Sequence, residues 1–301
     1  QWCELKNYAN ERGIRIIGDV PIYVAGDSVD VWTNPSQFYL DENLEPIDVA
    51  GCPPDAFSAD GQLWGNPLFR WDVMREDGYS WWTMRLRKMS TLYDVIRIDH
   101  FRGFDSYYAI PGKDTTARNG VWRNGPGMEL FRAVEEKLGK LDIIVEDLGF
   151  LTPSVLQLVA DSGYPGMKVV QFAFDSRDDS DYMPHNYDKH CVVYTGTHDN
   201  DTILGWMKQA PKNSVKKAKE YLRMTKEEGY NWGMMCGAWM SSANLAVVTM
   251  QDLIGLGSSA RMNIPSTLGG NWTWRALPGQ INAPLANKLH HKTELYGRLT
   301  R

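Results

Sequence analysis

Six short apolar runs, separated by segments of helical character, most strongly limit how this chain can fold. They are rich in Ile, Val and Leu, as strands buried within a sheet require, and they span residues 14–24, 93–99, 141–149, 166–174, 191–199 and 245–255. Strands that alternate with helices predict a parallel sheet. Two architectures fit this alternation: a doubly wound sheet, or a (β/α)8 barrel from which two strands are missing at the front.

Helices are predicted between the runs. Amphipathic patterns place them at about residues 2–12, 79–92, 127–139, 153–162, 213–225 and 229–243. The clearest boundaries belong to the fourth, where Thr152 can act as N-cap, Pro153 occupies the first position and Gly163 closes the end. Segments 25–78 and 105–125 are rich in Gly, Pro, Asp and Trp and lack a period, so we expect long functional loops there.

The run at 93–99 ends abruptly in charged residues. Arg97 and Asp99 are two positions apart, so strand alternation puts them on one face. A guanidinium beside Asp99 favours the ionised carboxylate, which suits a nucleophile better than a general acid. A structural ion pair explains this stretch equally well.

Two further runs also end in acids. Glu146 and Asp147 are neighbours that must face opposite ways, so only one of them can point into a barrel. His198, Asp199 and Asp201 follow the run at 191–199. Taken singly, Asp199 or Asp201 is better explained as a helix N-cap than as a catalytic group.

Together, the three acidic strand ends favour a common site at the carboxyl edge of the sheet, where barrel enzymes carry their active sites. Two carboxyl groups that flank a sugar acetal, one ionised and one protonated, perform retaining glycoside chemistry. In retaining enzymes, two such carboxyl groups lie about 5–5.5 Å apart. The chain also has 12 Trp and 14 Tyr. Flat aromatic faces stack on sugar rings, although core packing explains any single one of them.

Composition excludes several other classes. The net charge is -5 and the basic residues are scattered, so no nucleic-acid footprint is visible. The four cysteines form no CxxC pair, which argues against a zinc site and indicates reduced thiols. No apolar run approaches the roughly 20 residues of a membrane helix, no signal pattern opens the chain, and no nucleotide or HExxH motif occurs. We predict a cytoplasmic protein with no membrane contact, no metal and no cofactor.

Six motifs along the chain resemble those of the 4-α-glucanotransferases called amylomaltases or disproportionating enzymes. They are RIIGDVPIYVA, GQLWGNPLFRW, VIRIDHFRGF, IIVEDLG, YTGTHDNDT and RMNIPSTLGGNWTWR. The resemblance implies a (β/α)8 barrel of α-amylase type, of which residues 1–301 carry strands three to eight, with insertions at about 25–78 and 200–243. That family usually has glycine where this chain has Ser266, which we expect to stiffen the turn.

The resemblance also implies roles for the charged residues. Asp99 would be the nucleophile and Glu146 the acid and base, with their carboxyl oxygens about 5–5.5 Å apart. Asp199 would be a hydrogen-bond partner of the sugar hydroxyls that helps to distort the ring. Arg97 would hold Asp99 ionised, and Asp19 would belong to the residues that bind substrate.

Other residues match the family's sugar contacts. His100 and His198 would contact the sugar at the cleavage point. Phe57 and Trp64 lie in a stretch that matches the loop over the active site, and they are the expected stacking residues. Asn263 would contact the acceptor.

The predicted function is transfer of α-1,4-glucan segments between maltooligosaccharides by a retaining double displacement. One alternative is a plain α-glucan hydrolase, and another is a catalytically silent glucan-binding fragment that needs a partner. The chain begins inside a predicted helix, and no part of it matches the segment that carries the first two barrel strands in the family. We therefore expect further sequence in front of it, a second chain, or a second copy that supplies those strands.

Overall fold

A computed structural model describes residues 1–54, 58–149, 151–174 and 181–299. The chain divides into two compact units, Gln1–Gly166 and Met167–Arg301, and each is described by itself. All six apolar runs contain a strand, and the predicted α/β class with parallel sheets is confirmed.

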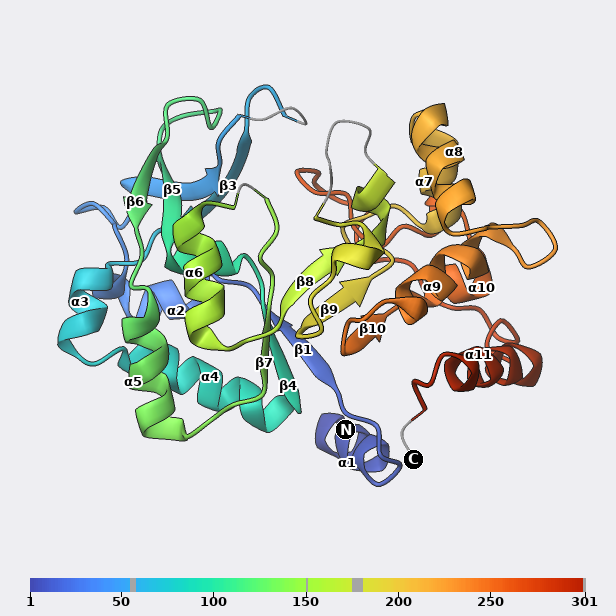
Figure 1. Ribbon diagram of the computed structural model, residues 1–301. Coiled ribbons are helices and arrows are strands. Elements are labelled where there is room, and N and C mark those ends of the chain that lie inside the picture. The colour runs from blue at the N-terminus through green and yellow to red at the C-terminus, as the bar shows by residue number, and fades with distance from the viewer. Residues whose placement is uncertain (55–57, 150, 175–180, 300–301) are drawn as a thin grey trace. The chain divides into compact units, whose positions relative to one another are not determined.

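The first unit contains a parallel sheet in the order β1-β4-β7. Its strands are β1 (Ile17–Val20), β4 (Val95–Ile98) and β7 (Ile143–Val145). Four helices correspond to predicted ones: α1 (Trp2–Asn10), α4 (Ser80–Leu92), α5 (Met128–Leu138) and α6 (Pro153–Ser162). Helix α4 packs against α5 and against strands β1 and β4 (Figure 1). The sheet register sets Asp19 of β1 directly beside Arg97 of β4, which is the structural basis of the site described below.

The segments predicted to be long loops, 25–78 and 105–125, form instead an antiparallel sheet with two short helices, so that prediction was wrong. The sheet order is β3-β2-β5-β6, with β2 (Asp48–Cys52), β3 (Gln62–Pro67), β5 (Ser106–Pro111) and β6 (Val121–Asn124). The helices are α2 (Val29–Thr33) and α3 (Trp71–Glu76), and short 3-10 turns occur at η1 (Pro35–Gln37) and η2 (Phe101–Phe104). Strands β2 and β5 pair although they are far apart in sequence, a contact that the local pattern does not show.

Aromatic side chains fill the core of this unit. The side chains of Trp81, Trp82, Phe69 and Phe104 are all buried, and the ring centroids of Trp82 and Phe104 lie 5.1 Å apart. Much of the aromatic excess therefore serves packing in this half of the chain.

The second unit contains a sheet in the order β10-β9-β8, with β8 (Gly166–Val169), β9 (Cys191–Tyr194) and β10 (Leu245–Val247). Strands β9 and β10 run parallel. The helices are α7 (Ile203–Gln209), α8 (Lys212–Tyr221), α9 (Tyr230–Met240), α10 (Met250–Ile254) and α11 (Ala283–Leu295), with 3-10 turns η3 (Val170–Phe174), η4 (Pro184–Asn186) and η5 (Ser258–Ala260). Helix α9, buried along most of its length, packs against α7, α10 and β10.

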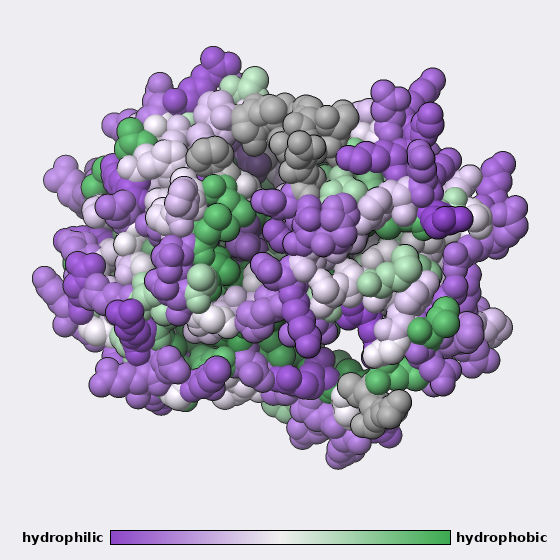
Figure 2. Space-filling model, in the orientation of Figure 1, coloured by the Kyte–Doolittle hydropathy of each residue, from purple (hydrophilic) through white to green (hydrophobic). Residues whose placement is uncertain are grey.

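The predicted ends of α6 are confirmed. Thr152 accepts a hydrogen bond from the backbone N–H of Val155, Pro153 is the first helical residue, and Gly163 has a left-handed φ of 62°. Helix α11 was not predicted, because it has no buried residue and hence no strong apolar face. No helix in the described part of the chain is long and apolar enough to cross a membrane. The face shown in Figure 2 is largely hydrophilic, with apolar residues in small groups.

Candidate active site

Four charged side chains meet at the carboxyl ends of β1, β4 and β7. Asp19 lies on β1 and Arg97 on β4, while Asp99 follows β4 and Glu146 follows β7. Parallel strands bring their carboxyl ends to one edge of a sheet, so the fold gathers residues that are up to 127 positions apart. Backbone hydrogen bonds fix the two strand ends, since Asp99 N–H donates to the Val20 carbonyl and Glu146 N–H to the Ile98 carbonyl.

Arg97 links all three acids. Its Nη1 donates to both carboxylate oxygens of Asp19, at 2.6 and 2.7 Å, and to Asp99 Oδ1 at 3.3 Å. Its Nη2 donates to Glu146 Oε2 at 2.8 Å. The side chain is only 8% exposed. Burial lowers the pKa of Arg97, but the negative charges of Glu146, Asp19 and Asp99 together raise it by more than burial lowers it. The net shift is upward, and the guanidinium stays charged.

Glu146 has the raised carboxyl pKa of this cluster. Burial, followed by a hydrogen bond to the Asp99 carboxyl and the charge of Asp99, raises the pKa of Glu146 well above its usual range, although Arg97 opposes the shift. Arg97 binds Asp99 through Nη1 and Glu146 through Nη2, and the separation of about 5–5.5 Å between the two carboxyl groups stays a prediction. Arg97 draws both groups to one guanidinium, and a proton on Glu146 can bridge to Asp99. Asp147 points elsewhere and is buried against Gly166.

His100 borders the cluster in a strained conformation. Its φ is 50°, in the left-handed region that non-glycine residues rarely adopt. Burial lowers the pKa of His100 to about 4, so the ring is neutral near pH 7. Its ring meets the edge of Trp64, with centroids 4.8 Å apart, and Trp64 lies on β3 of the antiparallel sheet. Phe57, the other predicted stacking residue, lies outside the described residues.

The second unit carries its own group of site residues, on the loop after β9 and the segment after η5. Asn263 Nδ2 donates to Asp199 Oδ1 at 2.5 Å, and His198 Nε2 lies 3.4 Å from Asp199 Oδ2. The Asn263 N–H donates to the His198 carbonyl at 3.0 Å, which ties the two segments together. Trp272 packs on the His198 ring at 5.0 Å.

The N-cap explanation does not hold for Asp199 or Asp201. The N-cap of α7 is Thr202, whose hydroxyl accepts from Gly205 N–H. Asp201 accepts instead from Gln209 Nε2 and from the Ser258 hydroxyl. Asp199 is thus left facing the neighbouring side chains of its own group rather than the helix.

Sequence reasoning missed Arg261. Its guanidinium donates to the backbone carbonyls of Asp199 and Asn263, and so braces the group. Arg261 opens the RMNIP stretch, but nothing in the local pattern distinguishes it from a surface arginine. Ser266, farther along the same segment, has a φ of 62°, the conformation that glycine adopts without strain.

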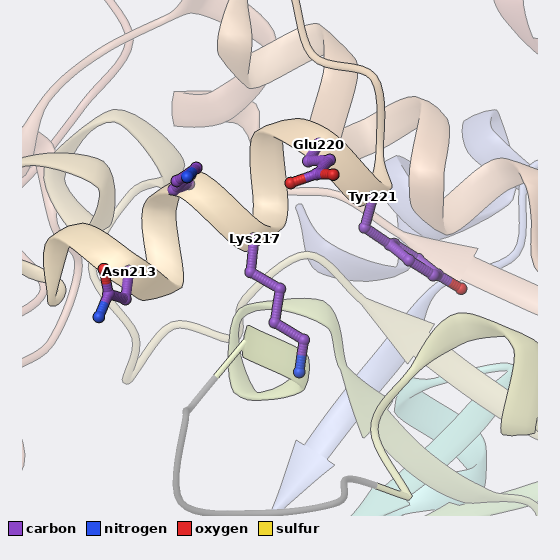
Figure 3. Close-up of a pocket in the computed structure, with 5 residues that line it drawn as sticks. Asn213, Lys217, Glu220 and Tyr221 are labelled. Atoms are coloured by element: carbon purple, nitrogen blue, oxygen red, sulfur yellow. The ribbon is translucent and has the colours of Figure 1, made fainter.

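Metal-binding side chains and surface concavities are two other kinds of possible site. No group of three or more His, Cys, Asp or Glu among the described residues is arranged to hold a metal ion. A concavity of about 460 Å³ lies on α8, and the side chains of Asn213, Lys216, Lys217, Glu220 and Tyr221 line it (Figure 3). None of the predicted site residues is among these.

The fold of this chain is one that amylomaltases have. The chain is similar to an amylomaltase from Streptococcus agalactiae solved with acarbose, with a TM-score of 0.96 and 42% identity over 99% of this chain and 61% of that one. The amylomaltase of Corynebacterium glutamicum has the same fold at a TM-score of 0.73 and 19% identity, covering 90% of this chain and 44% of that one.

Residues 1–280 match the family model described as 4-alpha-glucanotransferase, and the chain belongs to that family. It is 51% identical to a 4-alpha-glucanotransferase of Clostridium butyricum over 99% of this chain and 62% of the relative. It is 46% identical to a chloroplastic or amyloplastic 4-alpha-glucanotransferase of Solanum tuberosum over 99% of this chain and 52% of the relative. The chain therefore spans little more than half to three fifths of the relatives that it matches.

Proposed function

We propose that this chain carries the catalytic residues of a 4-α-glucanotransferase, which moves α-1,4-glucan segments between maltooligosaccharides with retention of configuration. The observation that carries the proposal is the pairing of a raised-pKa Glu146 with Asp99 around one buried arginine. Membership of the 4-alpha-glucanotransferase family, and the activity for which the similar proteins are named, support this proposal.

The chemistry follows from this pairing. The Asp99 carboxylate attacks the anomeric carbon, the glycosidic C–O bond breaks, and Glu146 gives its proton to the leaving oxygen. A hydroxyl of the acceptor sugar then attacks the same carbon, its proton returns to Glu146, and the bond to Asp99 breaks. Arg97 stays charged throughout and stabilises whichever carboxylate is ionised. The neutral ring of His100 can donate a hydrogen bond to a sugar hydroxyl or accept one from it, and it adds no charge to the site.

We assign Asp199 the role of hydrogen-bonding ring hydroxyls, with His198 and Trp272 beside it and Asn263 toward the acceptor. Asp199 is fixed by Asn263 and Arg261 before any sugar binds, which lowers the entropy cost of binding. Trp64 offers an aromatic surface next to His100 for stacking against a sugar ring. Preference for an acceptor sugar over water, at about 55 M, then depends on positioning.

A second polypeptide segment is part of the proposal. In the described sheets, β1 and β10 are terminal strands, and apolar residues such as Leu245 remain partly exposed. Open apolar edges invite further strands. We propose that two more strands, from another chain, a second copy or adjoining sequence, complete the barrel. We also propose a cytoplasmic location, which is favoured because none of the four cysteines forms a disulfide in the described part of the chain.

The test is incubation of the purified chain with maltotriose and separation of the products over time. A ladder of longer maltooligosaccharides together with glucose is expected, and Asp99→Asn or Glu146→Gln should reduce its rate by about 10³-fold or more. Asp72→Asn, which alters an exposed pair with Arg70, is the control and should leave the rate unchanged. Glucose and maltose without longer products would select the hydrolase. Unchanged maltotriose from folded protein would contradict activity of this chain alone and favour the glucan-binding alternative.

A further inference from the structure

Helix α10 carries two adjacent polar side chains in the protein interior. Asp252 is 1% exposed and Gln251 is 7% exposed, and neither takes part in the mechanism above. A buried polar group is costly unless it is hydrogen-bonded. Burial accordingly raises the pKa of Asp252, while hydrogen bonds from Ile203, Thr249 and Thr195 oppose the shift.

Asp252 holds both ends of the loop that carries Asp199. Its Oδ1 accepts from the Ile203 N–H at 2.7 Å, and its Oδ2 accepts from the Thr195 hydroxyl at 3.3 Å. Thr195 directly follows β9, and Ile203 begins α7. The span between them contains His198 and Asp199, so one carboxylate fixes the distance between the two ends of this loop.

Gln251 holds the segment that faces this loop. Its Nε2 donates to the Ala260 carbonyl at 3.1 Å. Ala260 directly precedes Arg261, whose guanidinium donates to the carbonyls of Asp199 and Asn263. The two neighbouring side chains of α10 therefore reach the two segments that meet at Asp199.

Helix α10 is itself anchored. Thr249 caps it by accepting from the Asp252 N–H at 3.2 Å, and Asn231 Nδ2 of the buried helix α9 donates to the Asp252 carbonyl at 2.7 Å. A group that must hold a sugar ligand within a fraction of an ångström needs rigid support of this kind.

We propose that Gln251 and Asp252 are positioning residues, which set the relative placement of Asp199, His198 and Asn263 through the two segments that they bind. The inference rests on the proposed function for the role of Asp199 toward sugar. It differs from a simple stabilising role, because it requires local rather than global effects when either side chain is changed.

The test compares three test variants, each close in size to the residue it replaces, with two control variants, all made in the full chain. Asp252→Asn removes the charge and one acceptor, Thr195→Val removes the hydroxyl at one end of the loop, and Gln251→Met removes the donor to Ala260. Leu253→Ala, on the same helix, is the packing control, since Leu253 is buried in the apolar core and should lower stability without cutting these bonds. Ser214→Ala is the neutral control, because its buried hydroxyl has no hydrogen-bond partner.

Two readouts are taken without substrate. Amide hydrogen exchange over residues 196–203 should quicken about tenfold or more in Asp252→Asn, and over residues 260–263 in Gln251→Met. The ring signal of His198 in a carbon–proton NMR spectrum, assigned with His198→Gln, should shift in these variants while those of the other five histidines stay in place. Leu253→Ala should lower the unfolding temperature but leave the His198 signal unmoved.

Unchanged loop exchange and an unmoved His198 signal in Asp252→Asn would overturn the inference, as would equal changes in Leu253→Ala. If Asp252→Asn does not fold, Thr195→Val decides by the same criteria. Since no substrate is present, a negative maltotriose result contradicts the proposed function alone and leaves this test intact.

Discussion

At the scale of single residues, the site depends on one guanidinium shared by three acids. Arg97 binds the acids through two nitrogens: Nη1 donates to Asp19 and Asp99, and Nη2 donates to Glu146. Lysine in this position would present a single charged point and could not reach all three in the same geometry. In the function proposed above, this arrangement would let Glu146 hold a proton while Asp99 stays ionised.

Glu146→Gln should change how stability depends on pH. The folded-state pKa of Glu146 is raised, so the folded protein binds a proton more tightly than the unfolded chain, and stability falls as pH rises from about 4.3 toward the folded pKa. Removing the carboxyl should abolish that part of the fall. The measurement is the unfolding temperature from about pH 4 to pH 8, where the variant should gain on the wild type as pH increases.

Glu129→Gln is the matched control, because Glu129 is half exposed and paired with Arg75 at 2.8 Å. Its difference from the wild type should not grow with pH in this direction. A constant difference for Glu146→Gln across the range would contradict protonation of Glu146 in the folded state.

Ser266→Gly should stabilise the protein by about 0.5–1 kcal/mol. The φ of Ser266 is 62°, where a side chain costs about 1–2 kcal/mol that glycine avoids, and greater freedom of glycine in the unfolded chain offsets part of this gain. Thermal unfolding measures it. Ser90→Gly, inside helix α4, should shift the unfolding temperature in the opposite direction. A loss of stability in Ser266→Gly would show that the serine side chain has a role that outweighs strain.

Residue-level reasoning from sequence predicted part of this cluster. Strand alternation placed Arg97 and Asp99 on one face, and they are bonded. Asp19 entered only by resemblance, as a substrate contact, and its bidentate bond to Arg97 depends on a strand register that local sequence does not contain. The separation of about 5–5.5 Å between the Asp99 and Glu146 carboxyl groups stays a prediction.

At the scale of elements, local signals predicted helices and buried strands, whereas distant pairing did not show itself. Helix α6 has its cap, its proline and its closing glycine within 12 residues, from Thr152 to Gly163, so its boundaries were predictable. The antiparallel sheet was not predictable, because its strands β2 and β5 are separated by some 50 residues and their pairing is not visible in either segment alone. Helix α11 escaped prediction for lack of a buried face.

Thr152→Ala should destabilise the protein by about 1 kcal/mol. The threonine hydroxyl accepts from the Val155 N–H, and alanine leaves that donor without its cap. The unfolding temperature, with exchange of the first amides of α6, measures the effect. Thr91→Ala serves as control, since the Thr91 hydroxyl bonds only within helix α4, to the Lys88 carbonyl, and the change should stay within about 0.5 kcal/mol. Equal effects of the two substitutions would contradict the capping role.

At the scale of the whole molecule, the two units have separate hydrophobic cores. Aromatic residues dominate the first, and methionine, alanine and two tryptophans are prominent in the second. Five of the 12 tryptophans are buried, so the aromatic excess was only partly a sign of sugar binding. Sequence predicted the alternation of strands and helices but not the division into units, which arises from contacts that no short segment contains.

The open strand edges predict self-association of the purified chain. Leu245, the first residue of terminal strand β10, is 38% exposed, and a lysine there should discourage pairing by another strand. Analytical ultracentrifugation should show association that increases with concentration and is weakened by Leu245→Lys. Leu156→Lys, which alters an exposed leucine on helix α6, should leave association unchanged. A monomer at all concentrations would argue that another chain or adjoining sequence, rather than a second copy, supplies the proposed strands.

The shared arginine also limits how a site of this kind can change over evolutionary time. Replacing Arg97, whose side chain is only 8% exposed, removes the shared partner of three acids, and breaking a buried ion pair in this way costs about 3–5 kcal/mol, a large part of a typical domain's stability. Loss of the arginine alone is therefore the least tolerated single step away from the present set. We expect the effects of substitutions at Asp19, Arg97, Asp99 and Glu146 to be strongly non-additive, so that descendants either keep all four or exchange them together.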